Sequence, residues 1–428
     1  MNKEKKKQTL PLRHLWIVVL LAVSTHSFAQ ANNTISIEEC YKLAQTNFPL
    51  VKQMALIDKT KEYSISNAAK GYLPQFTING QGTYQSEVTE IKIPNVTTTT
   101  LSKNQYKIYG EVYQSLTDAA TIKQQKELAK ANAETEQQKI EVELYKLKER
   151  INQIYFGILL IDAQIEQTEL LKKDIQSGID KTNAAITNGT ALKSNADNLK
   201  AELLKTDQRT IELKANRKGY TDMLAIFIAK QVTENTKLIT PVTQVIQPAI
   251  NRPELKLYET QKKSFDIQNK LITARNLPKV GLFFQGGYGR PGLNQLSNDF
   301  ATYYIGGLKL NWNFGGLYTA KNDRALLKIN QQTIDVQKEV FLFNTNLSLS
   351  QQNSEVDKFQ KLINTDNEII QLRQKVKTTA QAQLQNGVIT TNDYLTYVNA
   401  EDQARQNLLL HQVQLSLAQY NYQTTYGN

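Results

Sequence analysis

The sequence carries one pattern twice. "YLPQFTINGQGTY" at residues 72–84 returns as "NLPKVGLFFQGGY" at residues 276–288, and the two Leu-Pro prolines are 278 − 74 = 204 residues apart. Two Asn-Gly pairs are also spaced alike, with glycines at positions 189 and 387, a separation of 387 − 189 = 198 residues. Similar spacing of unrelated phrases indicates a tandem duplication, with repeats at 30–240 and 241–428.

Long stretches of each repeat contain no helix breakers. No proline lies between Pro94 and Pro241, and none follows Pro291. Within the first stretch, apolar residues alternate at spacings of four and three, which is the heptad pattern of a coiled coil. They are Ile140, Leu144, Leu147, Ile151, Ile154, Ile158, Ile161 and Ile165. The pattern predicts antiparallel helices at 118–187 and 195–230, and again at 317–385 and 391–422.

These helices are too long for an ordinary domain. At about 1.5 Å per residue, the helix at 118–187 is about 100 Å long. Its apolar stripe must therefore pack against equally long partners. Ser194 and Thr390 each precede an aspartate by three residues, a capping-box spacing that predicts where the returning helices begin.

In the zones rich in glycine and proline, apolar and polar residues alternate with a period of two. In residues 75–84, Phe76, Ile78 and Tyr84 share one face, opposite Thr77 and Asn79. The same alternation predicts strands at 105–116, 279–288 and 303–314. All four approach the length of about ten residues that a tilted membrane strand needs. Alternation alone would also suit a soluble sandwich.

The first 29 residues have the features of a secretory signal peptide. A basic start is followed by the apolar run "LWIVVLLAV" and a small-residue cleavage site after Ala29. Without this segment the net charge falls from +11 to 11 − 5 + 1 = +7. The remaining charge is spread along the helices, so we expect no nucleic-acid partner.

Residues for catalysis or metal binding are scarce. Beyond the first 29 residues the only histidine is His411, and it has no metal-ligand partner at a suitable spacing. Cys40 is the only cysteine, which excludes an internal disulfide. Glu38 and Glu39 precede it, so it does not fit a lipid-attachment site, and we expect a buried free thiol. We predict no enzyme, no cofactor and no metal site.

Strands placed in lipid cannot leave their edges unpaired, because each bare amide or carbonyl in hydrocarbon costs several kcal/mol. Four strands cannot close a barrel, since the smallest has about eight. Several copies of the chain would have to share one barrel, so a membrane location requires a homo-oligomer.

The complete order of elements resembles the TolC-type outer-membrane efflux channels. The resemblance covers the start "ISIEECYKLAQTNFPLVKQ", both Leu-Pro strand pairs, both Asn-Gly turns and the C-terminal "NGVITTNDYLTYVNAEDQARQNLLLHQVQLSLAQYNYQTTYG". It implies a trimer in the outer membrane of a Gram-negative bacterium, with a 12-stranded β-barrel standing on an α-helical barrel in the periplasm. It also implies two partners, a periplasmic adaptor and an inner-membrane transporter.

The resemblance further assigns roles to the turns. Residues Asn188, Gly189, Thr190, Asn386, Gly387 and Val388 correspond to the periplasmic tip where adaptors dock. Asp393 and Thr396 match the positions of two constriction acids, although only the first is acidic, and Ile389 replaces an arginine that locks some relatives. Asp393 could instead simply cap its helix.

Pro74 and Pro278 are expected where an ascending helix must end before a strand begins, because proline blocks helix continuation. The predicted function is a passive exit duct for efflux or type I secretion, opened at its tip by an adaptor. Two alternatives stay open, a periplasmic membrane-fusion adaptor and a soluble trimeric coiled-coil scaffold. The transported substrate cannot be read from the sequence.

Overall fold

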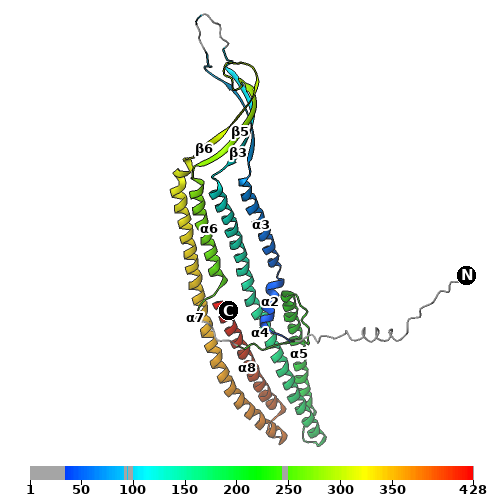
Figure 1. The fold of residues 1–428 in the computed structure, drawn as a ribbon. Helices are drawn as coiled ribbons and strands as arrows, with labels where there is room; N and C mark the ends of the chain where they lie inside the picture. Colours follow the sequence, from blue (N-terminus) through cyan, green and yellow to red (C-terminus); the bar gives the residue numbers. More distant parts are fainter. Residues whose placement is uncertain (1–33, 91–93, 95–99, 243–248, 428) are drawn as a thin grey trace, which may run out of the picture.

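The computed structural model describes residues 34–90, 94, 100–242 and 249–427. The chain is long and narrow, with a β-sheet at one end and helices running away from it toward two turns at the other end (Figure 1). The predicted signal peptide lies outside the described residues.

Four long helices form two hairpins. α4 (Ala119–Thr187) returns through α5 (Lys193–Ile228), and α7 (Gly315–Gln385) returns through α8 (Thr391–Tyr426). α4 has 69 residues and α7 has 71. The heptad stripe of α4 is buried from Ile140 to Ile161, as its spacing predicts.

Shorter elements complete the helical part. α6 packs between α4 and α7, while α3 packs on α4 (Figure 1). Near the middle of the molecule, two short strands pair in parallel. These elements are α2 (Ile37–Asn47), η1 (Pro49–Val51), α3 (Lys52–Ala69), η2 (Lys70–Tyr72), α6 (Pro253–Arg275), β1 (Thr34–Ile35) and β4 (Lys237–Leu238).

The sheet combines one hairpin from each repeat. Its strands are β2 (Gln75–Tyr84), β3 (Asn104–Ser115), β5 (Lys279–Arg290) and β6 (Ala301–Asn311). They pair in the order β2-β3-β5-β6, and every pair is antiparallel. β2 and β6 are therefore edge strands, each with one side unpaired among the described residues.

The register sorts the sheet residues onto two faces. Phe76 lies opposite Val112, which lies opposite Phe284, so large apolar side chains share a face. We call this the apolar face, and it consists of Phe76, Ile78, Tyr84, Tyr106, Ile108, Val112, Leu282, Phe284, Tyr288, Tyr304, Leu308 and Leu310. Most of these side chains are exposed, with Ile78 at 72% and Tyr304 at 73%. The other face, the polar face, carries Lys107, Glu111, Gln285, Lys309 and their neighbours in register.

Two clusters form the core of the helical part. One joins α2, α4, α5 and the end of α8 around Tyr155 and Phe156, and the other lies near the turns around Ile175, Leu199 and Val398. Cys40 belongs to the first cluster, fully buried and free, which confirms the sequence prediction. Burial raises the pKa of its thiol to about 12.

Several boundaries differ by one to four residues from the sequence prediction, those of β6 and α5 among them. β6 ends at Asn311, because Trp312 turns to donate a hydrogen bond from Nε1 to the Asn276 carbonyl (3.1 Å) and packs on Phe314. α5 begins at Lys193 with Leu192 as its N-cap, so the predicted cap at Ser194 is wrong. Within the described residues, none of the helices combines the length and apolar character needed to cross a bilayer.

Candidate functional site

The first tip turn ends α4 with a left-handed glycine. The N–H of Asn188 donates to Ala184 O (3.1 Å), and the N–H of Thr190 donates to Ala185 O (2.9 Å). Gly189 between them has φ +73°. A backbone hydrogen bond that spans six residues and encloses a glycine in the left-handed conformation defines the Schellman motif. This motif gives hydrogen-bond partners to the last carbonyls of a helix.

The second tip turn repeats this geometry at the end of α7. Asn386 donates from its N–H to Ala382 O (3.2 Å), and Val388 donates to Gln383 O (2.9 Å). Gly387 has φ +69°. The two repeats therefore end their longest helices with the same hydrogen bonds.

α8 begins with the capping box that its sequence predicts. The N–H of Asp393 donates to Thr390 Oγ1 (3.2 Å), and the N–H of Thr390 donates to Asp393 Oδ2 (3.0 Å). The Thr390 hydroxyl also donates to Asp393 Oδ2 (2.7 Å). This bond first, and then that from the Thr390 N–H, lower the pKa of the Asp393 carboxyl. Thr396 is exposed and donates its hydroxyl to Asn392 O (2.9 Å). Asp393 caps its helix, as one of the two sequence readings expects.

A cavity of about 770 Å³ separates the two tip turns. Leu192, Leu384, Ile389 and Tyr394 give it apolar surface, and Lys181 is the charged residue in its wall. The complete lining is Gly178, Lys181, Thr182, Ala185, Thr190, Ala191, Leu192, Asn195, Gln381, Leu384, Gln385, Asn386, Gly387, Ile389, Thr390, Thr391 and Tyr394. Of the residues that the resemblance assigns to the tip, Thr190, Asn386 and Gly387 line this cavity, whereas its lining does not include Asn188, Gly189 and Val388.

Above this cavity an ionic cluster links the two helix hairpins. Lys377 Nζ on α7 lies 2.8 Å from Asp174 Oδ2 on α4 and 2.9 Å from Glu401 Oε2 on α8. The Glu401 carboxylate also accepts from Arg405 Nε (2.5 Å). Burial opposes ionisation of Lys377 and Glu401, but their mutual hydrogen bonds and those to Asp174 and Arg405 outweigh it. The pKa of Lys377 is therefore raised and that of Glu401 lowered.

A second polar contact lies further from the tip. Buried Asp402 on α8 accepts from Gln167 Nε2 on α4 (3.0 Å) and lies 3.4 Å from Arg209 Nη1 on α5. Gln406, one turn further along α8, is buried with both amide atoms unpaired. The sequence analysis missed the Asp402 contact and the Lys377 cluster, because the residues that meet there are up to 235 positions apart in the sequence.

The two Leu-Pro prolines lie at the junctions between helices and sheet. Pro74 lies between η2, which ends at Tyr72, and the first residue of β2. Pro278 lies between the end of α6 at Arg275 and the first residue of β5. The chain changes from helical to extended geometry at both places.

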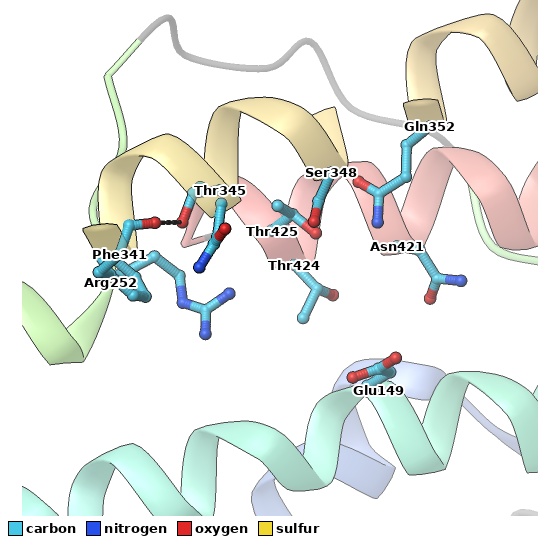
Figure 2. Close-up of a pocket in the computed structure, with 10 residues that line it drawn as sticks. Glu149, Arg252, Phe341, Thr345, Ser348, Gln352, Asn421, Thr424 and Thr425 are labelled. Carbon is cyan, nitrogen blue, oxygen red and sulfur yellow. Dashed lines mark hydrogen bonds between the residues drawn. The ribbon is translucent and has the colours of Figure 1, made fainter. Parts of the chain in front are cut away.

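A smaller, polar cavity of about 290 Å³ lies midway along the helices, between α4 and the α7–α8 pair (Figure 2). Figure 2 shows Glu149 of α4 across the space from Thr424, and Arg252 beside Phe341. Arg252 is already paired with Glu254 and lies over the rings of Tyr145 and Phe341. Its charge is therefore used within the chain.

His411, the histidine that the sequence analysis singles out, is paired with a carboxylate. His411 Nδ1 lies 2.6 Å from Asp366 Oδ2, which joins α8 to α7. No group of three His, Cys, Asp or Glu residues within the described ranges is placed to hold a metal ion.

Comparisons with solved structures give consistent matches over almost the whole chain. CusC, described for its transmembrane channel formation, matches with a TM-score of 0.64 and 15% identity, and 92% of each chain is covered. The outer membrane protein VceC of Vibrio cholerae matches at 0.61 and 13% identity, covering 92% of this chain and 96% of VceC. The open state of the Neisseria gonorrhoeae outer membrane channel MtrE matches at 0.63 and 13%, covering 92% and 89%.

No protein-family model matches the sequence, and no curated protein sequence matches it. At identities of 11–15%, the structural likeness establishes the fold. The chain has the TolC-type fold of these outer membrane channels.

Proposed function

We propose that this protein is a homotrimeric exit duct in the outer membrane, serving a tripartite efflux or type I secretion system. Three four-stranded sheets would form one 12-stranded barrel in lipid, and the helices would continue it as a tunnel in the periplasm. The duct is a passive conduit. An inner-membrane transporter supplies the energy, and a periplasmic adaptor opens the tip. The proposal takes its support from the fold and from three features of the surface.

The apolar face of the sheet is the observation that carries the proposal. It presents Phe76, Ile78, Phe284 and Leu308 to the exterior, with 53–72% of each side chain exposed. A contiguous exposed apolar surface of this kind marks an interaction site with lipid or protein. Alternation of apolar and polar residues along each strand is what a barrel wall between lipid and water requires.

The sheet edges support the oligomer. β2 and β6 each leave one row of backbone groups without a strand partner in the described chain. In hydrocarbon those groups need partners, and pairing β6 of one copy with β2 of the next supplies them.

An exposed apolar stripe on α7 supports the same arrangement. Its residues recur at helical spacing along the half of α7 nearest the sheet. α3, whose Leu56 and Tyr63 are exposed, lies on the opposite flank of the helical layer from α7 (Figure 1). A stripe of this kind needs a packing partner. The stripe comprises Leu326, Ile329, Val336, Val340, Phe343 and Leu347.

Adaptor docking is proposed at the tip turns. The cavity between them offers apolar walls and several polar groups, a combination that suits binding of a partner's side chains. The Lys377 cluster fastens the α7–α8 pair to α4, so docking that separates them has a defined set of contacts to break.

Disulfide trapping tests the shared barrel. We would replace buried Cys40 by alanine and introduce Asn79→Cys on β2. This cysteine is paired in turn with single cysteines on β6, which together sample successive registers between adjacent copies, at Tyr303, Ile305, Gly307 and Lys309. Oxidation of outer membranes should yield a covalent trimer at one or two of these pairs. Asn79→Cys with Tyr109→Cys is the control, since these residues are opposite each other within one chain.

Fractionation separates the alternatives. The native trimer should remain in the outer-membrane pellet and dissociate on a denaturing gel only after heating. A soluble scaffold would be released with the periplasm, and a membrane-fusion adaptor would fractionate with the inner membrane. Either result, or an absence of interchain disulfides, contradicts the proposal.

A further inference from the structure

The polar face of the sheet carries aromatic rings among its charged and amide side chains. Tyr109 and Tyr113 on β3, Phe283 on β5 and Tyr303 on β6 all point to this face. Polar residues alone would suffice for a wall that faces water. Four large rings on this face therefore call for a separate explanation.

Glycines on the neighbouring strands make room for these aromatic side chains against the sheet. Gly287 is paired with both Tyr109 and Tyr303, and a Cβ there would lie 2.6 Å from Tyr109 Cβ and 2.9 Å from Tyr303 Cζ. A Cβ at Gly281 would lie within 2.5–2.6 Å of three atoms at the tip of the Tyr113 side chain. The rings of Tyr113 and Tyr303 thus occupy the space that side chains at these positions would fill, and the Tyr109 side chain begins there.

Burial agrees with this placement. Tyr109, Tyr113, Phe283 and Tyr303 are all half-buried, whereas Tyr304, the neighbour of Tyr303 on the apolar face, is 73% exposed. A ring that lies along the sheet hides one side and leaves the other accessible. The polar face thus offers flat aromatic surfaces held in place by the backbone, which is the geometry that stacking requires.

The charges around the rings favour anions. Glu111 is the acidic residue among them, and it is already engaged, since Gln285 donates to it and Lys309 Nζ lies 3.2 Å from it. Lys107, two positions from Tyr109 on the same face, has no ion-pair partner in the described part of the chain. Its positive charge is therefore available to a ligand.

We propose that these rings and Lys107 form a binding surface for planar aromatic anions on the inner wall of the barrel. The inference rests on the proposed channel, which makes the polar face the lumen. A molecule with a flat ring would stack on Tyr109 or Tyr303, and its carboxylate would lie toward Lys107. Saturated molecules of the same size and charge lack the flat face and bind less well.

The same rings could serve only to brace the sheet, because large side chains over glycines stabilise strand pairing. Stability measurements cannot separate the two roles. A comparison of ligands that differ only in aromaticity can, because a bracing role would not distinguish them.

Saturation-transfer NMR on the trimer in lipid nanodiscs provides the test. The probes are 1-naphthoate, its saturated analogue decahydro-1-naphthoate and the cation 1-naphthylmethylammonium, with empty nanodiscs as the blank. Naphthoate should receive more magnetisation than the blank, and more than either other probe. Tyr303→Leu and Tyr109→Leu should each weaken its binding roughly two- to ten-fold, the size of one aromatic contact. Tyr304→Leu and Tyr288→Leu, on the apolar face, should leave binding unchanged.

Equal signals from naphthoate and its saturated analogue would overturn the inference, as would equal losses from variants on the two faces. Disulfide trapping between β2 and β6 of adjacent copies, as designed above, separates this failure from failure of the proposed function. A protein that gives the covalent trimer but does not select naphthoate refutes the aromatic surface alone. A protein that gives no interchain disulfide refutes the proposed function, and the aromatic surface with it.

Discussion

Single residues at the tips have backbone requirements that can be tested separately. Gly387 ends α7 with φ +69°, a conformation that costs other residues about 1–2 kcal/mol. Gly387→Ala should therefore destabilise the last turn of α7 by about 1 kcal/mol, seen as faster amide hydrogen exchange there. Gly219→Ala is the matched control, since Gly219 lies inside α5 with open space around it and should gain about 0.5–1 kcal/mol. Changes of the same sign in both variants would contradict the argument.

Lys377 is the second residue with a distinct role. Lys377→Met leaves buried Glu401 with Arg405 as its remaining cation. Loss of one partner from such a cluster should cost about 2 kcal/mol, or roughly a 30-fold loss of exchange protection around Glu401. Lys375→Met on the exposed side of α7 should have little effect. Equal effects of the two variants would show that the cluster contributes little.

At the scale of elements, the contact between the two helix hairpins should depend on pH. The lowered pKa of Glu401 means that its contribution is complete above its ordinary value of 4.5 and is lost as the pH falls through the lowered value. The raised pKa of Lys377 means that its contribution is complete below 10.5 and is lost as the pH rises through the raised value. The pair is surrounded by Asp174, Arg405 and Tyr394. The hydrogen bonds to Asp174 and Arg405 also contribute to the shifted pKa values of Lys377 and Glu401.

Spin labels can measure this dependence. Labels at Asp180→Cys on α4 and Asn392→Cys on α8, in the Cys40→Ala protein, occupy exposed positions near the two tips. Their pulsed-EPR distance distribution should be narrow at pH 7 and broaden well below pH 4.5. In the Lys377→Met variant, the distance distribution should be broad already at pH 7. A distribution unchanged down to pH 3 would contradict an ionic connection between the hairpins.

The elements also show what sequence patterns can reveal. The heptads of α4 and the capping box at Thr390 were predictable, because their signals are local and match the period of a helix. The capping signal at Ser194 failed because the helix begins one residue earlier, with Leu192 as its N-cap. The end of β6 was missed because alternation continues through Trp312 and Phe314, although these rings leave the sheet and pack at the junction with the helices.

Contacts between distant elements could not be predicted in the same way. Lys377 and Asp174 are 203 residues apart, and neither stands out from other charged residues on its helix. The tip turns were found through Asn-Gly pairs, whereas the cavity between them depends on how four helices approach one another. Local chemistry thus gave the parts of the candidate site, but packing determined which parts meet.

For the whole molecule, the two faces of the sheet should differ in their tolerance of charge. Phe284→Lys places an ammonium near the middle of the apolar face and should cost about 2–4 kcal/mol in a bilayer. We expect less heat-resistant trimer in outer membranes. Gln285→Lys, one residue away on the polar face and beside Glu111, should assemble normally. Similar losses from both variants would contradict a lipid-facing apolar face.

The even number of strands has a consequence for how copies join. Each of the four strands runs opposite to its neighbour, so β2 and β6 point in opposite directions. A second copy, rotated about an axis parallel to the barrel, can therefore pair its β2 with β6 of the first copy in antiparallel fashion. It does so without turning upside down. Every copy then sends its helices to the same side of the sheet. In the proposed trimer, the even strand count thus allows all copies to point the same way along the barrel axis, with their helices at one mouth.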